Sequence, residues 1–305
     1  MRVKILGAGS ALPDPVRGNP SQAVLVDDEA LLFDCGERTT VNLVSAGINP
    51  LDINHLFLTH LHWDHIVDLN YLLMTTWYCG RSKALNIYGP PGTREMTDAM
   101  LEAHAMDLRS RKALNDSLKG AQVEECFQAG PVFDIKRLES GVVLDTESYT
   151  VKAALVRHID LLGFQRSCWG FRVESEYGTV ALSGDTEPCQ EIVDLAQGVD
   201  LLIYECTFLD DTIASREMRG HSGPSGAGRV AHAAGVKKLV LNHLGPFDSS
   251  AAAVEMASMY YGDRRGPEVW SEIIRETARF YDGPIVLGED AMEIEVGCSP
   301  RETSG

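Results

Sequence analysis

Residues 53–65 read INHLFLTHLHWDH, an apolar, strand-like segment that runs directly into three histidines and an aspartate. His60, His62, Asp64 and His65 all fall within six positions. Imidazole nitrogen and carboxylate oxygen are the ligands that hold zinc and related divalent ions in proteins. Packing does not explain this density, because a structural histidine is usually solitary and satisfied by one neighbour. The stretch therefore predicts a metal-dependent enzyme.

The spacing within the stretch predicts two metal positions. His60 and His62 are two residues apart, so an extended backbone points both rings to the same side. Asp64 and His65 are adjacent and face different directions, which suits a second metal position. One short segment can thus supply ligands to two ions.

The composition of the 305-residue chain is that of an ordinary globular protein, but its formal charge is −17. Polyanion binding depends on cation-rich surfaces, and no dense Lys/Arg block is present. A nucleic-acid partner is therefore disfavoured.

Cysteine usage and hydropathy predict a cytoplasmic protein. No run of about 18 apolar residues would span a membrane, and the N-terminus lacks the pattern of a signal peptide. Seven cysteines occur without CxxC spacing, and an odd number cannot all pair internally. Reduced thiols in the cytoplasm are therefore expected.

The hydrophobic patterns predict strands alternating with helices in one domain that spans residues 1–305. Strands are expected at 2–6, 23–26, 30–34, 55–59, 85–88, 149–156, 179–182, 201–204, 238–241, 284–288 and 292–296. Helices are expected at 39–46, 66–79 and 225–234, in an insertion at about 94–122 that is a candidate cap, and in extra C-terminal helices at 250–262 and 268–281.

A histidine or acidic residue follows the end of several predicted strands. These residues are His158, Asp185, Glu205 and His243. In sheets with alternating helices, ligands and catalytic groups gather at that edge, so residues distant in sequence can converge there.

Each of these residues also has a simpler explanation. His158 and His243 could bond to loop carbonyls, and Asp185 could be an ordinary turn aspartate. His221 lies just before the predicted helix 225–234, where it could mark a helix entry or donate a proton.

With these residues in view, the chain resembles the metallo-β-lactamase superfamily, in the branch of ribonuclease Z and the zinc-dependent arylsulfatases. The resemblance rests on LGAGS at 6–10, DCGE at 34–37, THLHWDH at 59–65, His158, SGDT at 183–186, ECTF at 205–208 and the run 221–243. It implies an αββα sandwich, in which two mixed sheets pack face to face with helices outside.

The resemblance also implies a role for each matching residue. His60, His62 and His158 would hold one metal ion, Asp64, His65 and His243 the other, and Asp185 would bridge both. Glu205 and His221 would form the carboxylate–histidine pair of this branch, with His221 protonating the leaving oxygen. Asp64 would also accept a hydrogen bond from the nucleophile.

The expected cofactors are two divalent ions, most simply Zn²⁺, with Mn²⁺ or iron as alternatives. Such a pair lowers the pKa of a bridging water from near 16 towards ~7, so that hydroxide can attack carbon, phosphorus or sulfur. We therefore expect a hydrolase of an ester-type bond, which could be a phosphodiester, sulfate ester, carboxylic ester or lactone.

Two departures from ribonuclease Z favour a small-molecule substrate. The long tRNA-gripping arm of that enzyme has no evident counterpart after His158, and Trp63 occupies a motif position that is usually small. Aromatic residues expected near the mouth could stack on an aromatic leaving group or could simply belong to the core; they are Trp63, Trp77, Phe164, Trp169 and Phe247. We expect a homodimer without membrane contact.

Three other functions remain as alternatives: a ribonuclease Z-type endonuclease that processes the 3′ end of tRNA, an iron-dependent oxidoreductase, and a non-catalytic binding protein. Cleavage of precursor tRNA tests the first, and metal analysis tests the second. The complete ligand set argues against the third.

Overall fold

The computed structural model describes residues 1–305 except 118–130, 159–167, 217–218, 263 and 298–305. Within the described residues, the strands form two seven-stranded sheets, in the orders β14-β1-β2-β3-β4-β5-β6 and β13-β12-β11-β10-β9-β8-β7. The strands are β1 (Arg2–Gly7), β2 (Ser21–Val26), β3 (Glu29–Phe33), β4 (His55–Phe57), β5 (Leu85–Gly89), β6 (Phe133–Arg137), β7 (Gly141–Asp145), β8 (Tyr149–Val156), β9 (Cys168–Ser175), β10 (Gly178–Leu182), β11 (Leu201–Glu205), β12 (Leu239–Asn242), β13 (Ile285–Leu287) and β14 (Glu293–Glu295).

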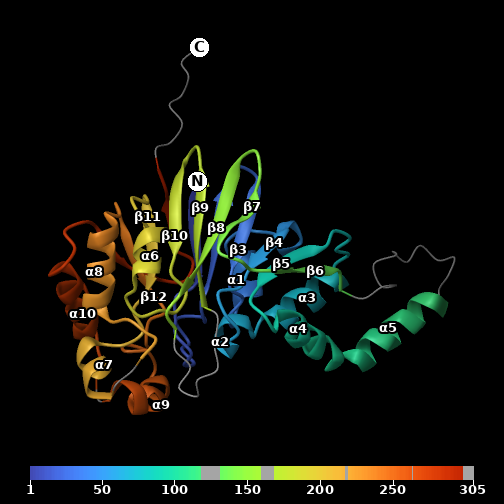
Figure 1. Ribbon diagram of the computed structural model, residues 1–305. Coiled ribbons are helices and arrows are strands. Elements are labelled where there is room, and N and C mark those ends of the chain that lie inside the picture. Colours follow the sequence, from blue (N-terminus) through green and yellow to red (C-terminus); the bar gives the residue numbers. More distant parts are fainter. Residues whose placement is uncertain (118–130, 159–167, 217–218, 263, 298–305) are drawn as a thin grey trace.

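Helices lie on both outer sides of the paired sheets. The helices are α1 (Thr39–Ser45), α2 (Trp63–Ile66), α3 (Leu69–Tyr78), α4 (Thr93–Glu102), α5 (Ala105–Ser117), α6 (Gln190–Leu195), α7 (Asp210–Arg216), α8 (Pro224–Ala234), α9 (Ala251–Tyr261) and α10 (Glu268–Ala278), with a 3-10 turn η1 (Pro50–Asp52). In Figure 1, α1 to α5 lie on one side of the sheets and α6 to α10 on the other. This is the αββα sandwich that the sequence predicts.

Side chains alternate along each strand between the space that separates the two sheets and the outer helices, and this alternation explains the layers of the fold. In β3, Leu31 and Phe33 face the space between the sheets, whereas Leu32 packs outward against the helices. In β11, Ile203 faces inward and Leu202 outward. Because successive side chains of a strand point to opposite faces, an uninterrupted apolar strand fills two cores at once.

The core between the sheets is centred on aromatic rings. The Phe57 ring centroid lies 5.0 Å from that of Phe33, 4.5 Å from that of Tyr88 and 5.6 Å from that of Phe171. Phe33, Phe57 and Tyr88 belong to the first sheet, whereas Phe171 comes from β9 of the second. These contacts hold the two sheets together and so fix the positions of their edges.

Both sheets are mixed, and their parallel parts bring strand ends together. β3 to β6 run parallel in the first sheet, as do β10 to β13 in the second. The carboxyl ends of parallel strands lie at one edge of a sheet, where loops present polar groups.

The described part of the predicted insertion forms α4 and α5, and residues 118–122 lie outside the described residues. Figure 1 shows α5 extending away from the two sheets. A capping role and the single-domain organisation stay predictions. Helices α9 and α10 occupy the C-terminal helical region expected from the sequence.

The region after His158 contains a strand that the sequence patterns did not identify, and most of the aromatic residues named as candidates for the mouth belong to the core. Residues 168–175 form a strand, β9, which pairs with both β8 and β10. Trp77, Trp169 and Phe247 are buried in the core and do not line an open mouth, because their apolar surface is covered by packing. Phe164 lies outside the described residues. No helix of the described chain is both long and apolar enough to cross a membrane.

Candidate metal centre

The polar residues singled out in the sequence converge at the carboxyl ends of strands from both sheets. His60 follows β4, His158 follows β8, Asp185 follows β10 and His243 follows β12, while Glu205 ends β11. His62 precedes α2, whose first turn carries Asp64 and His65. Gly184 has φ +60°, and a Cβ there would lie 2.8 Å from the Trp169 carbonyl oxygen, so the turn before Asp185 needs glycine.

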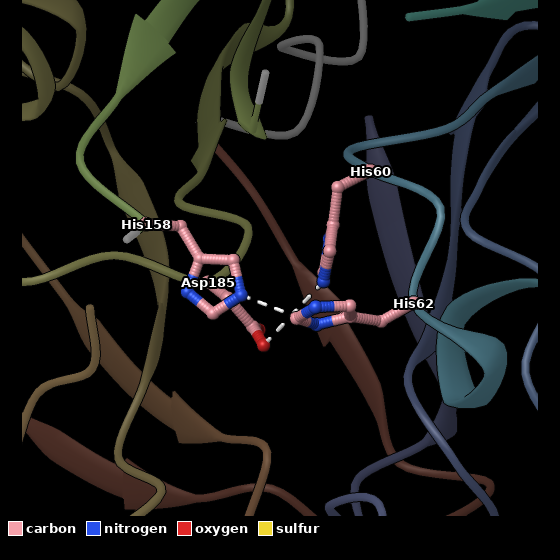
Figure 2. A group of neighbouring side chains, drawn as sticks. All are labelled: His60, His62, His158 and Asp185. Atoms are coloured by element: carbon pink, nitrogen blue, oxygen red, sulfur yellow. Dashed lines mark hydrogen bonds and ion pairs between the residues drawn. The ribbon is translucent and has the colours of Figure 1, made fainter. Parts of the chain in front are cut away.

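One group of potential ligands comprises His60, His62, His158 and Asp185, whose ligand atoms all lie within 4.8 Å of one another (Figure 2). His158 Nε2 lies 3.2 Å from His62 Nδ1, and His60 Nε2 lies 3.8 Å from Asp185 Oδ2. His60 Nε2 is buried without a hydrogen-bond partner among the described residues. A buried imidazole nitrogen in this condition is suited to a metal ligand.

A second group comprises Asp64, His65 and His243, and the other carboxylate oxygen of Asp185 faces it. Oδ2 of Asp64 lies 3.6 Å from His65 Nε2 and 3.3 Å from His243 Nε2. Oδ1 of Asp185 lies 3.4 and 3.5 Å from the same two nitrogens. Four ligands bound tetrahedrally to zinc lie about 3.3 to 3.4 Å apart, so this group fits such an ion.

Hydrogen bonds to the outer ring nitrogens set the tautomers of the histidines. His65 Nδ1 lies 2.8 Å from Asp34 Oδ2, and His243 Nδ1 lies 2.9 Å from Thr207 Oγ1. A proton on each Nδ1 leaves both Nε2 atoms with lone pairs, although these atoms are only 3.3 Å apart. Either a proton or a metal ion between these two nitrogens satisfies both of them, and the residues therefore fit a metal site.

The charge of the site also favours a cation. Burial opposes protonation of His65, but Asp185, Asp34 and Asp64 outweigh it and raise the pKa of His65 well above its ordinary value. Burial would likewise raise the pKa of Asp185, yet neighbouring histidines hold that pKa well below its ordinary range. The Asp185 carboxylate is therefore ionised and attracts positive charge, which a metal ion can supply.

Glu205 and His221 form a third group with Asp185. His221 Nδ1 lies 3.1 Å from Glu205 Oε1 and 3.8 Å from Asp185 Oδ2. Burial lowers the pKa of His221, but Glu205 and Asp185 outweigh it and raise that pKa to about 9. A protonated imidazole next to the potential metal ligands is placed to act as a general acid.

Glu205 also connects this pair to the second ligand group. Its Oε1 accepts from the Thr186 backbone N–H at 2.8 Å, and its Oε2 accepts from Thr207 Oγ1 at 2.6 Å. Because Thr207 Oγ1 also contacts His243 Nδ1, the Glu205 carboxylate contacts His221 directly and His243 through Thr207.

Sequence reasoning did not assign roles to Asp34, Thr59 and Thr207. Thr59 Oγ1 lies 2.9 Å from both Asp34 Oδ2 and His60 Nδ1, so it positions His60 as Thr207 positions His243. Asp34 also directly follows a strand, which is the signal that marked Asp185. Asp34 and His243 adopt left-handed backbone conformations, φ +57° and +59°, a strain that often accompanies functional positions.

The structure thus brings together all nine residues that were assigned roles, and those roles stay predictions. Trp63, in contrast, has 58% of its surface exposed at the start of α2. An indole this open to solvent does not cover the buried atoms of the potential metal ligands. The size of the Trp63 side chain therefore gives no information about the size of the substrate.

The chain is similar in sequence to a known protein family and to several ribonucleases Z. The family model described as "Anti-Pycsar protein Apyc1" matches residues 1–216. A ribonuclease Z of Mycobacterium bovis is 31% identical, with 97% of this chain and 98% of the relative covered. A ribonuclease Z of Methanothermobacter thermautotrophicus is 32% identical, with 80% and 86% covered.

Solved structures with the same fold include the short form of human tRNase Z, which is 25% identical and has a TM-score of 0.66 over 98% of this chain and 100% of that one. The metallo-β-lactamase fold protein YhfI from Bacillus subtilis is 18% identical, with a TM-score of 0.68 over 96% and 98%. Zn²⁺-bound PqqB from Methylobacterium extorquens is 16% identical, with a TM-score of 0.62 over 97% and 100%.

These relatives overturn the expectation of a small-molecule substrate with nucleic acid disfavoured. Two relatives are named as ribonucleases, and a solved structure is that of a tRNase. The net charge was a poor guide to the substrate class, because it sums the whole chain and does not show how charge is distributed over the surface. Nothing in the single chain bears on the homodimer.

Proposed function

The chain belongs to the metallo-β-lactamase superfamily, within it to the ribonuclease Z branch and, over residues 1–216, to the family of the anti-Pycsar protein Apyc1; on this premise we propose that it cleaves a phosphodiester bond at the 3′ end of precursor tRNA. The protein is a metal-dependent hydrolase, and its side-chain clusters fit a dinuclear site. The observation that carries the proposal is the His221–Glu205 pair held against Asp185.

We propose zinc as the metal because the potential ligands are imidazoles and carboxylates that are mostly buried and lie close together. His60, His62 and His158 would hold one ion, Asp64, His65 and His243 the other, and Asp185 both. When bound, two such ions activate a water molecule and neutralise charge on the phosphate. A cytoplasmic location is part of the same proposal.

The protein residues supply the proton and the orientation. We assign Asp64 to accept a hydrogen bond from the attacking water. The attacking water gives up one proton to the solvent, and as its oxygen bonds to phosphorus, the bond from phosphorus to the leaving sugar oxygen breaks. Glu205 accepts a hydrogen bond from His221 Nδ1, so the proton that neutralises the leaving oxygen comes from His221 Nε2.

The test is cleavage of a precursor tRNA that carries a 3′ trailer, with the purified, metal-loaded protein. We expect a single cut that separates the tRNA body from the trailer. Asp185→Ala, measured in parallel, should neither cut nor retain metal, which controls for contaminating nucleases. A fully metal-loaded protein that leaves the precursor intact contradicts the proposal.

A further inference from the structure

A cavity of about 650 Å³ lies beside His221 and is large enough for a nucleotide. Glu187 and Pro188 after β10 form one wall, Ile213 of α7 another, and the start of α8 a third. His221 lines the cavity and also lies 3.8 Å from Asp185. The cavity therefore adjoins the candidate metal centre through the candidate proton donor.

Two arginines, Arg219 and Arg229, line this cavity and are exposed. The Arg229 guanidinium carbon lies 4.3 Å from the centre of the Phe280 ring, and its Nε donates to the Ser225 carbonyl oxygen at 3.3 Å. These contacts orient the guanidinium group of Arg229. Across the described part of the chain, neither arginine forms an ion pair with a carboxylate.

Of the two acidic residues that line the cavity, Glu187 and Asp210, the latter is already engaged. Asp210 accepts hydrogen bonds from the Ser225 backbone N–H, at 3.2 and 3.3 Å, and from Ser225 Oγ at 2.6 Å. The Asp210 carboxylate is thus paired with hydrogen-bond donors at the start of α8. Within the described residues, neither Glu187 nor Asp210 forms an ion pair with Arg219 or Arg229, so both guanidinium groups can contact a ligand, and guanidinium is well suited to phosphate.

The chemistry of His221 indicates which part of a substrate lies here. A histidine that protonates the leaving oxygen must contact it, so the group attached to that oxygen lies next to His221. We propose that the cavity binds the nucleotide on the leaving side of the scissile phosphodiester, with Arg219 and Arg229 holding its next phosphate. This inference rests on the proposed function.

The test compares Arg219→Ala and Arg229→Ala with Arg109→Ala, which removes the same charge from an exposed side chain on α5, outside the cavity. Binding of adenosine monophosphate to the metal-loaded protein is measured by calorimetry, and KM for precursor tRNA is measured as a function of salt. Each cavity variant should weaken nucleotide binding and raise KM by about tenfold. Each should also reduce the salt slope by roughly 1.

The outcomes separate this inference from the function on which it rests. If both cavity variants bind adenosine monophosphate as the Arg109→Ala control does, the cavity is not a nucleotide site and the inference is wrong. If the wild type leaves precursor tRNA intact but the cavity variants still lose nucleotide affinity, the proposed function fails and the nucleotide site remains.

Discussion

Replacing Thr207 with valine removes one hydroxyl while nearly preserving the volume of the side chain. That hydroxyl donates to Glu205 Oε2 at 2.6 Å and lies 2.9 Å from His243 Nδ1. A hydrogen bond to a charged group contributes about 1.5–3 kcal/mol. Losing it should weaken metal binding by about 2 kcal/mol, or about 30-fold, within the 10–100-fold range for the outer partner of a metal ligand.

The assay is a competition with a chromophoric chelator, which counts the ions released and gives the affinity of each. We expect one of two ions to be lost first, because Thr207 contacts only His243 among the predicted ligands. Thr207→Ser should restore binding. Thr97→Val is the matched control, because it deletes a similarly buried hydroxyl that bonds to the Thr93 carbonyl oxygen on α4.

The result that refutes this reasoning is an unchanged affinity. If Thr207→Val binds both ions within twofold of the wild type, the hydroxyl does not position His243. Equal losses in Thr97→Val would instead indicate a general effect of deleting a buried hydroxyl.

Three further predictions concern the ions, the proton donor and the core. Asp185→Ala should bind less than one ion per chain by elemental analysis, because Asp185 faces both ligand groups; two retained ions would exclude it as the bridge. Activity should fall as pH rises through the His221 pKa, about 9, and Glu205→Gln should move that alkaline limb to lower pH, since the Glu205 carboxylate raises this pKa; an unmoved limb in a pH–rate profile contradicts the pairing. Phe57→Ala should lower the free energy of unfolding by about 3–5 kcal/mol, because the ring is buried between the sheets; denaturant titration with a loss below about 1 kcal/mol would contradict that packing.

The apolar patterns of the sequence predict most of the strands and helices, and the resemblance to the metallo-β-lactamase superfamily predicts their layered arrangement. β8, for example, coincides with the predicted strand 149–156, since alternation is strong there. The pattern fails at β9, where residues 168–171 are all buried. A strand covered on both faces loses the period of two, so alternation could not identify it.

The cluster of potential metal ligands at residues 60–65 could be predicted from the sequence alone. His60, His62, Asp64 and His65 lie within six positions, so local backbone geometry is enough to bring them together. Tertiary structure decided the rest. Asp34 reaches His65 across 31 positions and Thr207 reaches His243 across 36, contacts set only when the strand ends meet. The order of residues along the chain does not show which of them will be close in space, because the packing of the two sheets decides those contacts. This packing places hydrogen-bond partners beside the potential metal ligands and brings His221 next to Asp185.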